Sequence, residues 1–148
     1  MTVALRIRGA RPGDADSLAR LSTQLGYPAT PAEAKLRAKG IVGQRGHALL
    51  VAEVDGRVVG WIHVVECVRM ESDPSAEVAG LVVDEAFRGS GIGARLLAEA
   101  EAWAVAGGYE ILRVRSNVKR NRARRFYERE GYKVTKSQRN FVKRLRSA

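Results

Sequence analysis

One short stretch of the chain has the residue types that bind a phosphate or diphosphate group. It reads FRGSGIGARLL over residues 87–97, so that glycines alternate with other residues just before a helical pattern. Glycine has no Cβ, and the main chain can therefore adopt positive φ and approach a ligand closely. Successive N–H groups that lead into a helix N-terminus bind anions. We predict such a site from the main chain of Gly89, Ser90, Gly91, Ile92, Gly93 and Ala94, with Arg88 at its mouth.

Two common phosphate-binding loops fit this stretch less well. A Walker loop requires Gly-Lys-Ser/Thr, which the sequence does not contain. The dinucleotide fingerprint G-x-G-x-x-G/A is matched by Gly89, Gly91 and Ala94, but residues 84–88 separate these glycines from the preceding strand pattern. The acid expected about 20 residues later is also missing, because residues 115–117 read Arg-Ser-Asn. A Rossmann domain is therefore the weaker interpretation.

The apolar pattern predicts a mixed α/β sheet in a single domain that spans all 148 residues. The expected order is β-α-α-β-β-β-α-β-α-β-β. Strands are predicted at 3–10, 47–54, 57–68, 76–83, 110–116, 132–135 and 140–145, and helices at 12–28 with a stop at Gly26, 30–40, 91–107 and 119–130.

Local signals support several of these boundaries. Asp55-Gly56, between two strand patterns, predicts a type I′ hairpin. Thr30 and Glu33 have the spacing of a capping box, with Pro31 at the first helical position, and predict the start of the second helix. Residues 72–75, Ser-Asp-Pro-Ser, are expected to form a polar turn before the strand at 76–83.

The net charge of +10 is concentrated at the C-terminus. Residues 111–148 contain 14 of the 26 Lys and Arg residues but only two of the 16 acidic residues. This favours an anionic partner: nucleic acid, an acidic protein or a phosphorylated small molecule. No stretch approaches the roughly 20 apolar residues of a membrane span, and the N-terminus is too short and charged for a signal peptide. Cys67, the single cysteine, offers neither an internal disulfide nor metal-ligand spacing. These features favour a cytoplasmic protein that needs neither a membrane nor a metal.

The glycine stretch resembles the signature of the GNAT superfamily of acetyl-CoA-dependent N-acetyltransferases, Arg/Gln-x-x-Gly-x-Gly/Ala. Here the signature reads RGSGIG over residues 88–93, within GLVVDEAFRGSGIGARLL, which has the hydrophobic run, acidic turn and Leu-Leu of the family. A second block, NRARRFYEREGY at residues 121–132, has the family's spacing of Ala, Tyr and Gly-aromatic. The resemblance implies the GNAT acyltransferase fold over essentially the whole chain.

The resemblance also implies which residues bind the cofactor, acetyl-CoA. The main chain of Leu81, Val82 and Val83 would pair with the pantetheine arm, where a bulge or splay of the strand exposes an N–H toward the thioester carbonyl. The asparagine that is common in the second block falls on Arg120, with Asn121 beside it. Basic and polar residues near that helix would meet the phosphates and adenosine of coenzyme A; the candidates are Asn117, Arg120, Asn121 and Arg124.

The implied reaction is direct transfer of the acetyl group to a primary amine, without an acyl-enzyme. Tyr127 occupies the position of the family's tyrosine near the sulfur, and a phenol with a pKa of about 10 can give a proton to the departing thiolate. Glu77 lies 11 residues before Arg88, where some histone acetyltransferases of the superfamily have a catalytic glutamate. We expect Glu77 to share a strand face with Ala79 and Leu81 and to take the proton of the ammonium; a water chain is the alternative base.

The acceptor is a small-molecule or protein amine, and loop 22–30 is expected to cover it, with Gln24 and Tyr27 as contacts. Two other functions stay open: a nucleic-acid-binding protein that uses the basic C-terminal region, which is less favoured, and a GNAT-fold sensor that binds acyl-CoA without turnover. Residues 139–145 could pair between subunits of a homodimer. His47 and His63 are expected in strands, with no catalytic partner.

Overall fold

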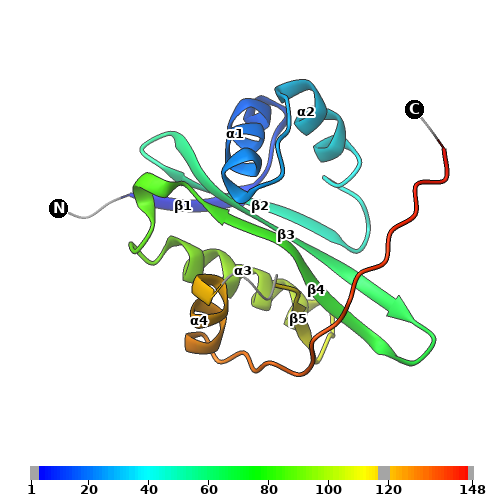
Figure 1. Ribbon diagram of the computed structural model, residues 1–148. Helices are drawn as coiled ribbons and strands as arrows, with labels where there is room; N and C mark the ends of the chain where they lie inside the picture. The colour runs from blue at the N-terminus through cyan, green and yellow to red at the C-terminus, as the bar shows by residue number, and fades with distance from the viewer. Residues whose placement is uncertain (1–3, 117–120, 147–148) are drawn as a thin grey trace. The chain divides into compact units, whose positions relative to one another are not determined.

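The computed structural model describes residues 4–116 and 121–146, and the chain divides into two compact units, Met1–Arg115 and Ser116–Ala148. The first unit contains a five-stranded sheet of order β1-β2-β3-β4-β5 (Figure 1). The strands are β1 (Leu5–Gly9), β2 (His47–Val54), β3 (Arg57–Arg69), β4 (Ser72–Val83) and β5 (Leu112–Val114). Neighbouring strands are antiparallel except for β4 and β5, which are parallel.

Helices cover both faces of this sheet (Figure 1). One face carries α1 (Ala15–Leu25) and α2 (Pro31–Lys39), which bury Leu18 and Leu21 against Val51 and Val82. The other face carries α3 (Ile92–Ala106), the crossover between β4 and β5, whose buried residues are Ile92, Leu96, Leu97, Ala100 and Ala104. Two short 3-10 turns, η1 (Pro12–Asp14) and η2 (Glu85–Phe87), precede α1 and α3. The mixed α/β sheet predicted from the sequence is confirmed.

The predictions of the Asp55-Gly56 turn and of the Thr30 cap are also confirmed. Asp55 and Gly56 both have positive φ, 49° and 80°, as a type I′ turn requires. Glu33 donates its N–H to Thr30 Oγ1 at 3.1 Å, and Thr30 donates its N–H to Glu33 Oε1 at 2.9 Å. These reciprocal bonds form the capping box that starts α2.

A β-bulge interrupts β4 at Ala79. His63 and Val64, which are adjacent in β3, pair with Gly80 and Val78, so Ala79 has no partner of its own. The extra residue reverses the alternation of side chains along the strand. Glu77 therefore shares a face with Gly80 and Val82, the face covered by α1 and α2. Our expectation that Glu77 shares a face with Ala79 and Leu81 is wrong for this reason.

Two further predictions about the strands are wrong. Residues 72–75 are part of β4, and the turn after β3 lies at 70–71, because the strand pairing extends to Arg69 and Ser72. The predicted strands at 132–135 and 140–145 are not formed: residues 132–144 have no regular structure, although Val134, Phe141 and Val142 are exposed. Five basic residues interrupt the apolar residues of this segment, so no continuous apolar face is available for burial; they are Lys133, Lys136, Arg139, Lys143 and Arg144.

The second unit contains one helix among its described residues, α4 (Asn121–Arg129). Within residues 4–116 and 121–146, no helix is long and apolar enough to cross a membrane.

Candidate active site

The glycine stretch forms an open loop between η2 and α3. Gly89 and Gly91 have φ of 81° and 85°, a conformation that residues with a Cβ rarely adopt. A Cβ built on either glycine would meet no atom within 4 Å. The glycines are therefore required by the main-chain conformation, and the space beside them is free for a ligand.

The main-chain N–H groups of this loop are available to a ligand. Within the described part of the chain, none of the N–H groups of residues 89–94 donates a hydrogen bond, whereas the next one, of Arg95, binds the carbonyl of Gly91 at 3.1 Å. Ser90 donates its hydroxyl to the carbonyl of Phe87, which holds the turn. The free donors lie at the N-terminus of the 15-residue helix α3, an arrangement that suits an anionic group.

A buried ion-pair cluster anchors the start of this loop. The buried carboxylate of Asp84 accepts hydrogen bonds from the N–H of Ala86 and from Arg20, and Arg57 lies 3.8 Å away. Arg20 also donates to the carbonyl of Val58 at 3.0 Å. Burial opposes the charge of Asp84, but these hydrogen bonds and cations outweigh it and lower the pKa of the carboxyl group. Sequence reasoning missed this cluster, since its members are far apart in the chain.

The strand that leads into the loop has one open edge. β5 pairs with β4 only over Ala76–Val78, so within the described part of the chain residues 79–83 have a strand neighbour on one side alone. The N–H of Asp84 binds the carbonyl of Val59 in β3, and successive residues direct their main-chain groups to opposite sides. Leu81 and Val83 therefore face the open edge, whereas Val82 faces β3. Arg88 Nε donates to the carbonyl of Val83 at 3.3 Å, which places Arg88 at this edge.

Glu77 lies just before the bulge, in a largely buried position. Its side chain is 17% exposed, and Arg115 Nε lies 2.8 Å from Glu77 Oε1. The alignment of the two groups is too poor for a hydrogen bond, so within the described chain this buried oxygen accepts none. Glu77 therefore has an oxygen that is ion-paired with Arg115 but not hydrogen-bonded, on the sheet face covered by α1 and α2.

Three of the predicted site residues, Tyr127, Asn121 and Arg124, belong to the described part of the second unit. Tyr127 contacts Phe126 and Tyr132 edge-on, and burial raises the pKa of its phenol to about 12. Asn121 begins α4, and Arg124 donates to Glu128 at 3.0 Å on its exposed side. The other two predicted cofactor contacts, Asn117 and Arg120, lie outside the described residues.

The two predicted acceptor contacts lie at the C-terminal end of α1. Gln24 Oε1 accepts the N–H of Glu85 at 3.0 Å, so this side chain ties α1 to the approach of the glycine loop. Tyr27 is 64% exposed, and its carbonyl accepts the hydroxyl of Ser22.

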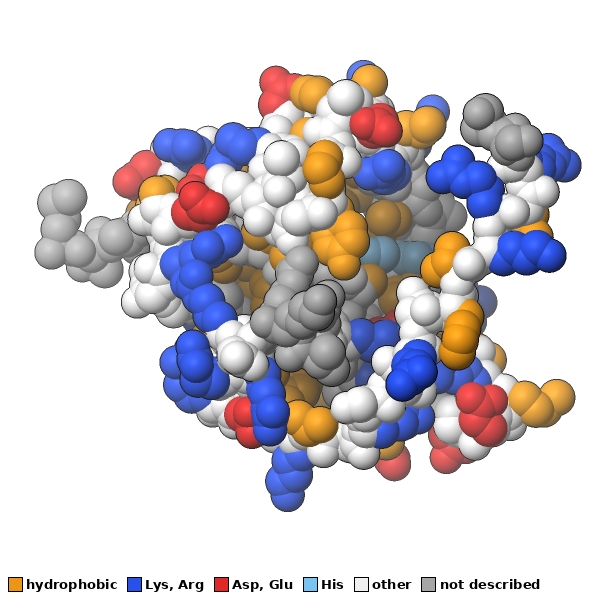
Figure 2. Space-filling view, in the orientation of Figure 1, with side chains coloured by type: hydrophobic (Ala, Val, Ile, Leu, Met, Phe, Trp, Pro, Cys, Tyr) orange, Lys and Arg blue, Asp and Glu red, His pale blue; other side chains and the backbone are white. Residues whose placement is uncertain are grey.

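A pocket of about 140 Å³ lies between α1, α2 and the sheet, and the sequence did not reveal it. His63 lines it and stacks on His47, with ring centroids 5.3 Å apart and Nδ1 of His47 3.0 Å from Nε2 of His63. Burial, aided by the neighbouring ring, lowers the pKa of His63. Histidine side chains are visible in a hollow beside apolar side chains in Figure 2. The two histidines are 16 residues apart in the sequence, and the pairing of β2 with β3 brings them into contact.

Comparison with known proteins gives a family match over most of the chain. The family model described as Acetyltransferase (GNAT) family matches residues 16–132. A relative from Salmonella typhimurium strain LT2, aminoalkylphosphonate N-acetyltransferase, is 41% identical over 80 residues. That match spans about half of each protein, 53% of this chain and 52% of the relative.

Solved structures with the same fold cover nearly all of the chain. An aminoglycoside N-acetyltransferase AAC(6')-Iy in complex with CoA has a TM-score of 0.86 at 17% identity, over 98% of both chains. An aminoglycoside antibiotic 6'-N-acetyltransferase AAC(6')-Ih from Acinetobacter baumannii has a TM-score of 0.85 at 16% identity, over 96% of this chain and 99% of that one. At such identity the likeness shows the fold alone.

Proposed function

The chain belongs to the acetyltransferase (GNAT) family, and on this premise we propose that it transfers an acetyl group from acetyl-CoA directly to a primary amine. The observation that carries the proposal is the open glycine loop, in which six consecutive N–H groups, those of residues 89–94, have no acceptor within the described chain. An acyl-CoA is the ligand of this family that carries a diphosphate.

The residues of the first unit fit this cofactor. The free N–H groups and the helix N-terminus suit the diphosphate, and the space beside Gly89 and Gly91 admits it. The main-chain groups of Leu81 and Val83 at the open edge of β4 suit the amides of the pantetheine arm. Asn121 and Arg124, together with Asn117 and Arg120, stay predictions for the adenosine end.

Acetyl-CoA supplies the acetyl group as a thioester: the nitrogen–carbon bond forms, the carbon–sulfur bond breaks, the amine loses a proton and the sulfur gains one. The main-chain N–H of Ala79, the residue without a pairing partner at the bulge, stabilises the developing negative charge on the carbonyl oxygen. Glu77, whose carboxylate lies just before the bulge, takes the proton of the amine. Tyr127 carries its phenolic proton at neutral pH. It gives that proton to the departing thiolate and regains one from solvent.

The names of the relatives support one class of acceptor. They are an aminoalkylphosphonate N-acetyltransferase and two aminoglycoside N-acetyltransferases. We propose a small-molecule amine as the acceptor, in preference to a protein amine.

Two measurements test the proposal together: the Kd of acetyl-CoA by calorimetry, and the release of free thiol with a panel of amines. Binding with turnover supports an enzyme. Binding without turnover of any amine would instead support the sensor, and absence of both would refute the cofactor site. Tyr127→Phe should lower kcat by roughly 100-fold without changing the Kd of acetyl-CoA, since only proton transfer is lost.

A further inference from the structure

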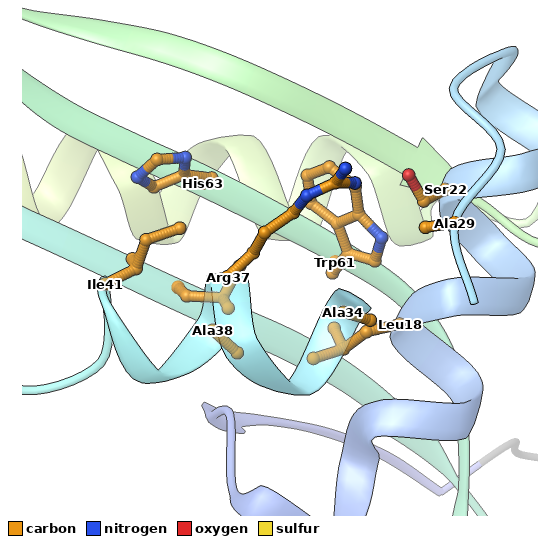
Figure 3. A pocket seen from close by; sticks show the side chains of 10 residues that line it. Leu18, Ser22, Ala29, Ala34, Arg37, Ala38, Ile41, Trp61 and His63 are labelled. Carbon is orange, nitrogen blue, oxygen red and sulfur yellow. The ribbon is translucent and has the colours of Figure 1, made fainter. Parts of the chain in front are cut away.

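The pocket beside the β4 bulge has two chemically different ends. Figure 3 shows Ser22 and Ala29 at one end, Ile41 and His63 at the other, and the Arg37 side chain extending from α2 alongside Trp61. The rest of its lining is apolar. A ligand of this pocket therefore needs an apolar part, and a polar group that the hydrogen-bond donors of Trp61 and Arg37 can bind.

Trp61 provides a hydrogen-bond donor that the protein leaves unused. Its indole Nε1 is buried and has no partner within the described chain. A buried donor without an acceptor destabilises the folded protein, because it has lost its hydrogen bonds to water. Trp61 lines the pocket, and in Figure 3 its Nε1 lies on the side of the ring toward Ser22 and Ala29. A small shift of the ring would let an acceptor atom of a ligand at this end satisfy the N–H.

Arg37 adds a positive charge beside Trp61 (Figure 3). Its guanidinium lies 3.7 Å from Glu33, but both side chains are more than half exposed, so this pair is weak and can be exchanged for a ligand. An indole N–H and a guanidinium, both donors, together select an oxyanion.

The pocket adjoins the place where the acetyl group would be transferred. Trp61 packs on Gly80, where an added Cβ would lie 2.8 Å from its ring, and Gly80 directly follows the bulge. His63 is the pairing partner of Gly80, so the His63 end is the nearer one to the bulge. Trp61 and His63 are two residues apart on β3, a span of about 6.6 Å.

The size of the pocket limits the ligand. A cavity of about 150 Å³ holds one benzene molecule. The open pocket of about 140 Å³ therefore accommodates roughly six to eight non-hydrogen atoms of a ligand.

We propose that this pocket binds the acceptor, a small primary amine that also carries an acid group. Trp61 Nε1 and Arg37 bind the oxyanion, and the amine lies at the His63 end, toward the bulge. The inference rests on the proposed acetyltransferase function, which could still hold with a different acceptor. Carboxylate and phosphonate are both oxyanions that accept hydrogen bonds from these donors. The test compares one amine of each kind.

The direct test is the ¹H–¹⁵N spectrum of the two indole N–H groups, which needs no turnover. The probes are 2-aminoethylphosphonate, 3-aminopropanoate and, as an acid-free control, 1-aminopropane. The Trp61 signal should move downfield with both acids and not with 1-aminopropane. Trp103, which stacks on Tyr109, is the internal reference, and a Trp103→Phe variant assigns the signals. The larger response identifies the preferred acid group.

Kinetics with a matched pair of variants give the second test. Arg37→Gln should raise KM for the preferred acid about ten-fold with kcat unchanged, and should leave KM for 1-aminopropane unaltered. Lys35→Gln removes an exposed cation from the same helix, outside the pocket lining, and should change neither value. Trp61→Phe keeps an aromatic ring, removes the N–H and should raise KM for the acid as well.

Unmoved Trp61 signals with both acids, or an equal shift with 1-aminopropane, would overturn the inference. Turnover of amines without preference for an acid would also overturn it while leaving the acetyltransferase proposal intact. If Trp61→Phe does not fold, the comparison of KM between Arg37→Gln and Lys35→Gln still tests the inference. Equal KM values for the acid in these two variants would overturn it.

Discussion

Two segments of β4, one on each side of the bulge at Ala79, differ in how completely they are paired, and we call them its two halves. Residues 76–78 have β3 on one side and β5 on the other, and this half carries the largely buried Glu77. Residues 80–83 have β3 alone, and lead into the glycine loop with its free N–H groups. Ala79, the bulged residue, separates the halves. Complete pairing positions a side chain, whereas incomplete pairing leaves main-chain groups free to bind.

This difference explains why the open half needs other anchors. A strand with one free edge, followed by a loop of free donors, gains little from main-chain hydrogen bonds. The cluster of Asp84, Arg20 and Arg57 and the buried side chain of Ile92 secure the loop at its two ends. The donors can therefore stay unpaired in a loop whose ends are well anchored.

The largest effect is expected from Gly91→Glu, which should abolish acetyl-CoA binding. The carboxylate would occupy the free space and repel the diphosphate. Loss of two charge-assisted hydrogen bonds, at about 1.5–3 kcal/mol each, already raises Kd at least about 100-fold. Gly108→Ala is the control for backbone strain, because Gly108 has φ of 81° at the other end of α3 and equally free space. Calorimetry with retained affinity in Gly91→Glu would show that this loop is not the diphosphate site.

Deletion of Ala79 should remove the boundary between the halves. Val78 and Gly80 already lie on opposite faces, so the deletion restores regular alternation and both halves keep their faces. Loss of the freed N–H should lower kcat by roughly 100- to 1000-fold while the Kd of acetyl-CoA changes little. Ala79→Gly keeps the bulge and should keep the activity. A deletion variant with normal kcat would rule out a catalytic role for the bulge.

Glu77→Gln tests the fully paired half. The amide keeps the shape of the side chain but cannot take a proton, so kcat/KM should fall by roughly 100-fold. Glu71→Gln, at the exposed turn before β4, is the matched control and should leave the rate unchanged. Equal rates for both variants would favour a water chain as the base.

The smallest effect is expected at His63, opposite the bulge. Burial lowers its pKa in the folded protein below the ordinary value of 6.5, so protons bind preferentially to the unfolded chain. Its contribution to stability is therefore complete above pH 6.5 and is lost as the pH falls below that value. Denaturant unfolding between pH 7.5 and 5 should show a smaller loss of stability in His63→Gln than in the wild type. Asp14 and Asp84 have lowered pKa values, so their contributions are lost only under more acidic conditions.

Much of the fold could be predicted because its signals are local. The Asp55-Gly56 turn, the Thr30 cap and the glycines before α3 each depend on residues within a few positions of one another. The two C-terminal strands were predicted wrongly because alternation shows only that a segment could be a strand. A partner strand decides whether the segment becomes one.

The candidate site also has features that local sequence determines and features that only tertiary contacts determine. The residue types and spacing at positions 88–94 determined an open loop with positive φ at Gly89 and Gly91, because positive φ and missing Cβ atoms are properties of glycine itself. The bulge at Ala79, the face of Glu77, the Asp84 cluster and the pocket around Trp61 were decided by tertiary structure alone. Each depends on which strands and helices are neighbours, and contacts between residues far apart in the chain leave no pattern in a single sequence.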